Sequence, residues 1–115
     1  MGKTLTEKIL SAKSGTEARS GDIVIAKVDL VFVQDTTGPL TIRQFQAAGF
    51  EDLANSLKAA LFLDHAAPSS NRESSNDHAL LRSFAQQAGC FISDVGNGIC
   101  HQVLAESLAK PSDLI

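Results

Sequence analysis

Short apolar runs alternate with amphipathic segments over most of the chain. Residues 59–63 form a continuous apolar run, and a second run begins the stretch 90–95. Unbroken runs of this length are typical of strands buried on both faces of a sheet. Residues 74–88 and 99–108, which follow the two runs, carry apolar side chains at helical spacing. The second half of the chain therefore predicts two strand-to-helix units.

The first half of the chain has the same organisation. Residues 4–7 have the composition of a capping box, and the apolar face that follows predicts a short helix that ends at Gly15. Residues 23–33 are rich in β-branched side chains but include two charged residues, which predicts one bent strand or two short ones. A proline in the first turn and a closing glycine then predict a helix within 38–49.

This alternation predicts the α/β class: three layers, with helices on both faces of a mostly parallel sheet. We expect residues 1–115 to form part of one domain, since no internal repeat or linker interrupts them. Residues 110–115 read as a turn that leads into a further apolar strand. We therefore expect the sheet to be incomplete and the domain to continue.

Composition and charge exclude several classes of protein. Of the 115 residues, 43% are hydrophobic and 20% are charged, which is typical of a globular domain. The formal charge is −3 and no basic block is present, so we expect no nucleic-acid partner. No apolar run approaches membrane-spanning length, and the first residues lack a signal-peptide core. Two cysteines make no disulfide framework, which favours a cytoplasmic location.

Polar residues follow each predicted strand, at the end where the loops of a parallel sheet bind ligands. Gln34 and Asp35 follow the first strand, Asp64 and His65 the second, and a glycine turn leads to His101 after the third. Because the carboxyl ends of parallel strands meet at one edge, we expect these side chains to line a common rim.

Spacing alone leaves the roles of these residues open. A carboxylate beside an imidazole fixes its tautomer and favours its protonated form, so Asp64 and His65 could be an acid–base pair. Adjacent side chains need not touch, and such a pair is more often a cap or a loop anchor. Gln34 and Asp35 could bind a carboxylate ligand or cap the next helix, the cap being the commoner role.

The cysteines and the remaining histidines predict no metal site. Cys100 and His101 are neighbours in a predicted helix, where adjacent side chains do not face each other, so we expect no Cys–His nucleophile pair. Cys90, Cys100, His65 and His101 have no recognised zinc spacing. His78 is expected to face away from the apolar side of its helix. We assign no metal ligand to this chain.

Seven short motifs occur in order along the chain. They are MGKT (1–4), EKIL (7–10), GDIV (21–24), VDLV (28–31), QDTTGP (34–39), LDH (63–65) and GNGICHQ (96–102). In this order they resemble the amino-terminal part of the aconitase superfamily, most closely large subunits of the 3-isopropylmalate dehydratase and homoaconitase type. Each motif alone is weak, but seven in register over residues 1–115 are specific.

The resemblance implies a hydro-lyase that isomerises a hydroxy di- or tricarboxylic acid by dehydration and rehydration. A [4Fe–4S] cluster serves in the complete family enzyme, where one iron acts as Lewis acid. Asp64 and His65 match an acid–base pair at the departing hydroxyl, and His101 matches a histidine that shapes the site through a carboxylate partner. Gln34 matches a residue that touches a substrate carboxylate. The implied partners are the rest of the large subunit and a separate small subunit.

The chain also departs from the family pattern. Family members continue into a Gly-x-Asp-Ser-His-Thr segment and later supply three cluster cysteines, which Cys90 and Cys100 do not match. We therefore expect this chain to bind no cluster by itself and to be inactive alone. Its uncovered apolar faces should make it self-associate or be only marginally stable. The alternative is a stand-alone α/β module that binds a carboxylate or a protein partner without catalysis and folds as a stable monomer.

Overall fold

The computed structural model describes residues 2–115, so Met1 of the MGKT motif lies outside the described residues. Its longest helix has 17 residues, and within this range no helix has both the length and the apolar character to cross a membrane. The elements are α1 (Leu5–Ser14), β1 (Val31–Gln34), α2 (Gly38–Ala47), the 3₁₀ turn η1 (Ser56–Lys58), β2 (Ala59–Phe62), α3 (Arg72–Ala88), β3 (Phe91–Ser93), α4 (Cys100–Val103) and the π-helical turn η2 (Leu104–Leu108).

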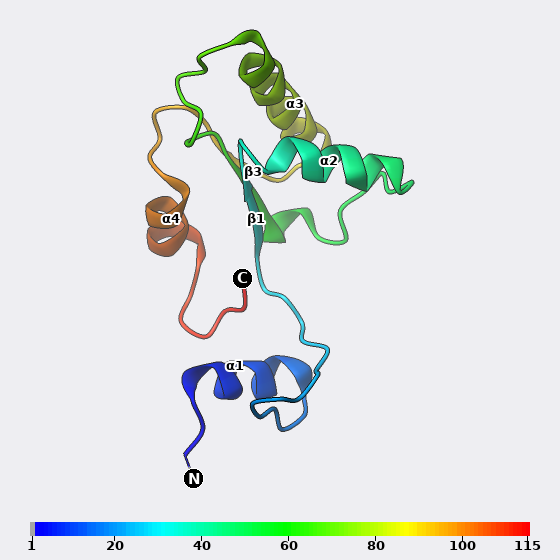
Figure 1. Ribbon diagram of the computed structural model, residues 1–115, viewed down its shortest axis with the longest axis vertical. Coiled ribbons are helices and arrows are strands. Elements are labelled where there is room, and N and C mark those ends of the chain that lie inside the picture. Colours follow the sequence, from blue (N-terminus) through cyan, green and yellow to red (C-terminus); the bar gives the residue numbers. More distant parts are fainter. Residues whose placement is uncertain (1) are drawn as a thin grey trace.

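The three strands form one parallel sheet in the order β1-β2-β3. Helices α2 and α3 lie on one face, and α4 lies on the other (Figure 1). Both crossovers step in the same direction across the sheet, and right-handed connections then place α2 and α3 on the same face. The predicted α/β architecture, with a parallel sheet between helical layers, is confirmed.

The central strand β2 is buried on both faces, which explains its continuous apolar sequence. Ala60 and Phe62 point toward the layer formed by α4 and η2. Leu61 and Leu63, at the alternate positions, pack in the cluster beneath α2 and α3. All four side chains are at most 3% exposed. Burial on both faces removes the polar alternation that a strand with one solvated face would show.

Helix α1 forms as the sequence predicts but stands apart from the sheet (Figure 1). The hydroxyl of Thr4 accepts a hydrogen bond from the Glu7 amide at 3.2 Å, and the Glu7 carboxylate accepts one from the Thr4 amide at 2.8 Å. This is the predicted capping box. Gly15 ends the helix with a φ of 71°, a left-handed conformation that glycine adopts without strain.

The strand predicted over 23–33 is largely wrong, because regular pairing begins only at Val31. The preceding segment has no strand beside it within the described residues, and Ile23 and Ile25 are 100% and 94% exposed. The Asp29 carboxylate forms an ion pair with Lys13 of α1 at 2.7 Å, and it accepts a hydrogen bond from the backbone amide of Leu114. β-branched composition favours extended backbone, but a strand also needs a neighbour to pair with.

Candidate functional site

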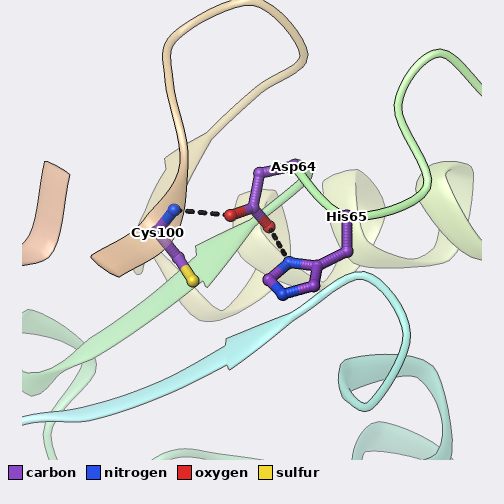
Figure 2. A group of neighbouring side chains, drawn as sticks. All are labelled: Asp64, His65 and Cys100. Carbon is purple, nitrogen blue, oxygen red and sulfur yellow. Dashed lines mark hydrogen bonds and ion pairs between the residues drawn. The ribbon is translucent and has the colours of Figure 1, made fainter. Parts of the chain in front are cut away.

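Asp64 and His65 follow β2 at the carboxyl edge of the sheet. The Oδ1 atom of Asp64 lies 2.9 Å from Nδ1 of His65, and its Oδ2 atom accepts a hydrogen bond from the Cys100 amide (Figure 2). The Asp64 side chain is 3% exposed, whereas that of His65 is 41% exposed. A buried carboxylate therefore holds an accessible imidazole by one nitrogen and leaves Nε2 free to meet a ligand.

The same contacts set the protonation of the pair. Burial acts to raise the pKa of Asp64, but the hydrogen bonds from His65 and Cys100 outweigh burial and lower it. The hydrogen bond to Asp64 raises the pKa of His65; burial opposes this rise, and the negative charges of Asp64 and Asp35 add to it. The arrangement thus favours an ionised carboxylate beside a protonated imidazole.

His101 lies near this pair, at the start of α4. Its ring centroid is 6.2 Å from that of His65 and 6.4 Å from that of Phe32, which it meets edge-on. The Sγ atom of Cys100 lies 3.2 Å from Nδ1 of His101, so the expectation that these neighbours do not face each other is wrong. In the first turn of a helix, no preceding turn keeps a side chain from folding back. The structure thus brings Asp64, His65 and His101 together.

The contact between Cys100 and His101 is not a nucleophile pair. Cys100 is fully buried among apolar side chains. Burial raises the pKa of its thiol, and the neighbouring Asp64 carboxylate raises it further. The reactive form of cysteine is the thiolate, which this environment disfavours.

Gln34 ends β1 at the same edge of the sheet, in register with Phe62 of β2. Its Oε1 atom accepts hydrogen bonds from both the amide and the hydroxyl of Thr36, each at 2.7 Å. Within residues 2–115 its side chain makes no hydrogen bond to Asp64 or to the two imidazoles. The amide nitrogen of Gln34 is the group that remains to donate to a carboxylate.

Asp35 does not cap α2, the role that its position favoured. Thr37 occupies the N-cap position and makes no capping hydrogen bond through its side chain. The fully buried Asp35 carboxylate accepts hydrogen bonds from the amides of His65 and Ala66, both at 2.9 Å. Asp35 therefore ties β1 to the loop that carries His65.

His78 is the third group bound to Asp35, with Nε2 2.9 Å from Oδ2 of the carboxylate. Its side chain is 5% exposed, so the expectation that it faces away from the apolar side of α3 is wrong. His78 shares the buried face with Leu81 and Ala85. Leu81 and Ala85 follow His78 by three and seven residues, which is the spacing of one helix face and could have revealed its burial. Histidine was not counted among the apolar positions because it is polar.

Three possible metal donors meet at the site. Atoms from Asp64, His65 and Cys100 lie within 4.8 Å of one another. Both Asp64 oxygens already accept hydrogen bonds, however, and burial keeps Cys100 as a thiol. Metal binding would require the thiolate and would compete with the hydrogen bonds that Asp64 already accepts. The group fits a hydrogen-bonded acid–base site better than a metal site.

The residues of this chain do not fit the iron–sulfur cluster that the family resemblance implies. A [4Fe–4S] cluster is held by thiolates that converge on it, three of them where one iron stays open to substrate. The chain contains two cysteines. Cys90 packs against the apolar side chains beneath α2 and α3, and Cys100 packs on the opposite face of the sheet. The two sulfur atoms therefore cannot serve one cluster in this fold.

Thiol labelling checks the placement of the two cysteines. With a disulfide reagent such as DTNB we expect Cys90, which is partly exposed, to react in the native chain and Cys100 to react only after unfolding. Cys90→Ser should abolish the native-state reaction and leave the reaction in urea intact. Rapid labelling of Cys100 in the native chain would contradict its burial at the start of α4.

Comparison with known proteins identifies close relatives. The chain is 48% identical over 115 residues to the 3-isopropylmalate dehydratase large subunit of Elusimicrobium minutum, covering all of this chain and 28% of that protein. It is 47% identical over 115 residues to large subunit 1 of Thermotoga maritima, covering all of this chain and 27% of that protein. Large subunit 2 of Archaeoglobus fulgidus is 47% identical over 114 residues, which cover 99% of this chain and 27% of that protein.

The chain thus spans little more than a quarter of the length of the curated relatives it matches. The sequence profile of the aconitase family (aconitate hydratase) matches residues 7–115. That match includes all three strands and every residue of the site at the edge of the sheet. The chain belongs to the aconitase family.

Proposed function

We propose that this chain supplies the acid–base pair of an aconitase-type hydro-lyase, as part of a 3-isopropylmalate dehydratase large subunit. Residues 1–115 would form the amino-terminal portion of its α/β/α domain. The observation that carries the proposal is the geometry of Asp64 and His65, in which a buried carboxylate lies 2.9 Å from an accessible imidazole and raises the pKa of that imidazole. The names of the relatives favour 3-isopropylmalate as the substrate.

In the dehydration step, His65 would donate the proton that converts the departing hydroxyl group of the substrate into water. Asp64 stabilises the imidazolium before transfer and holds the neutral ring in place afterwards. For rehydration the same ring, now neutral, accepts a proton from the incoming water. The proton on the neighbouring carbon would go to a base supplied by another segment.

The remaining site residues would bind and orient the substrate. The Gln34 amide nitrogen would donate to a carboxylate of the substrate, and His101 would present its imidazole beside that of His65. Asp64 also borders an open cavity of about 350 Å³, formed with the glycine turn before α4. Its lining does not include His65, His101 or Gln34.

The rest of the site would come from other segments. Since Cys90 and Cys100 lie on opposite faces of the sheet, the cluster of the complete enzyme would be ligated outside this chain. The remainder of the large subunit and a separate small subunit are the proposed partners. On this proposal the 115-residue chain alone is inactive.

A chimeric enzyme tests the proposal. This chain would replace the corresponding segment in the Elusimicrobium minutum large subunit, which is 48% identical to it over 115 residues. With the cognate small subunit, we expect the chimera to dehydrate 3-isopropylmalate, measured by the ultraviolet absorbance of the unsaturated product.

The unaltered relative is the positive control, and the 115-residue chain alone is the negative control. A chimera that folds and contains its cluster but gives no turnover would contradict the proposal. Binding of a dicarboxylic acid by the isolated chain, without turnover in the chimera, would favour the stand-alone binding module instead.

A further inference from the structure

The loop that carries His65 is held by a buried carboxylate from a different strand. Asp35, directly after β1, accepts the amide of His65 on Oδ1 and the amide of Ala66 on Oδ2, each at 2.9 Å. Consecutive amides bound to the two oxygens of one carboxylate fix the backbone on both sides of the His65 Cα atom. The direction in which the His65 side chain leaves the loop is therefore set by Asp35.

Asp35 is itself held by His78 of α3. Nε2 of His78 lies 2.9 Å from Oδ2 of Asp35, and beside an ionised carboxylate, which only accepts hydrogen bonds, this nitrogen is the donor. The Asp35 side chain is fully buried and that of His78 is 5% exposed. Buried charges are rare unless paired, and this one receives three hydrogen bonds from two separate elements.

We propose that Asp35, held by His78, is a positioning residue that keeps the His65 imidazole against Asp64 at the edge of the sheet. The inference rests on the proposed function, in which His65 transfers a proton. A carboxylate that only stabilised the loop could bind any of its amides, whereas Asp35 binds the amides on both sides of the His65 Cα atom. Asp35 also acts through charge, since its carboxylate contributes to the raised pKa of His65.

The groups that face His65 come from three elements. Asp64 touches its Nδ1 atom, Asp35 binds its backbone, and the His101 ring lies 6.2 Å away. The Cys100 thiol also lies in this group, but burial keeps it uncharged. Replacing Asp35 by asparagine thus removes one of the two negative charges that act on His65 and leaves Asp64 unchanged.

Histidine titration by NMR on the 115-residue chain tests the inference. In Asp35→Asn we expect the His65 pKa to fall, and the His65 and Ala66 amides to exchange with solvent about tenfold faster as their hydrogen bonds weaken. Asp77→Asn is the matched control, because Asp77 lies on α3 next to His78 and pairs with Arg43 at the surface. It should leave both readouts unchanged.

Two further measurements make the test independent of whether Asp35→Asn folds. His78→Gln keeps an N–H donor for Asp35, so it should shift the His65 titration less than Asp35→Asn does. In the unsubstituted chain, the His65 and Ala66 amides should exchange more slowly than the Ala67 amide, which makes no hydrogen bond within residues 2–115. Equal exchange of these amides, or an unchanged His65 titration in a folded Asp35→Asn, would overturn the inference.

Turnover separates this inference from the proposed function. In an active chimera, Asp35→Asn should lower kcat about tenfold to a hundredfold with little change in KM, because a proton donor is displaced rather than a binding group lost. An inactive chimera with the expected NMR result would defeat the proposed function and leave the positioning of His65 standing. Full activity of Asp35→Asn in the chimera would defeat the positioning role alone.

Discussion

Replacing His65 by glutamine in the chimeric large subunit should lower kcat by about 10²- to 10⁴-fold, the range typical of a lost general acid or base. Glutamine has a similar length and can still hydrogen-bond to Asp64, so the fold and the substrate contacts should persist. KM should therefore change much less than kcat. The measurement is steady-state dehydration of 3-isopropylmalate, with circular dichroism to verify folding of each variant.

Asp64→Asn gives the matched variant for the same step. It keeps an oxygen for the Cys100 amide but removes the negative charge that raises the pKa of His65. On the proposed mechanism His65 would donate its proton only below its own pKa, so activity should decline as the pH rises through that value. In Asp64→Asn the pKa falls, and the alkaline limb of the profile of kcat/KM against pH should move to lower pH.

One control variant makes these results specific to Asp64 and His65. Asp77→Asn removes a carboxylate that pairs with Arg43 on the surface, and it should leave both kcat and the pH profile unchanged. A His65→Gln chimera with undiminished kcat would rule out proton donation by His65. If the alkaline limb stayed in place in Asp64→Asn, another group would set it.

The sheet could be predicted from sequence because its strongest signal is local. The run at 59–63 is apolar without alternation, and the structure buries its successive side chains on opposite faces. Capping side chains and glycines that act within a few residues mark both ends of α1 and α3, whereas α4 begins after Ile99 without a side-chain cap. The segment 23–30 could not be predicted in this way, because extended composition does not reveal whether a neighbouring strand is present.

Part of the site could also be predicted from the sequence, and part could not. Asp64, His65 and His101 were expected at one edge of the sheet, because the topology of parallel strands brings their carboxyl ends together. The role of Asp35 was hidden, since its partner His78 lies 43 residues away and histidine does not register in an apolar stripe. Contacts between distant polar residues leave no periodic signal, so they emerge only with the fold.

Phe62→Ala should remove a large part of the stability of the chain, at a cost of about 3–5 kcal/mol out of the roughly 5–15 kcal/mol typical of a domain. Phe62 is fully buried in the central strand, with its ring centroid 6.0 Å from those of Phe32 and Phe91. Alanine would leave a cavity between the sheet and α4, which a rigid parallel strand cannot close.

Urea unfolding followed by circular dichroism measures this loss, and Phe50→Ala is the matched control. Phe50 is 58% exposed, so its removal should cost about 1 kcal/mol or less. Equal losses in the two variants would mean that packing against α4 contributes little to the stability of the fold.

Phe62 and Cys100 belong to the same apolar cluster, and the Cys100 amide binds Asp64. Loosening this cluster by Phe62→Ala should therefore also expose the Cys100 thiol to labelling. The packing that stabilises the fold is thus also the packing that holds Asp64 in place.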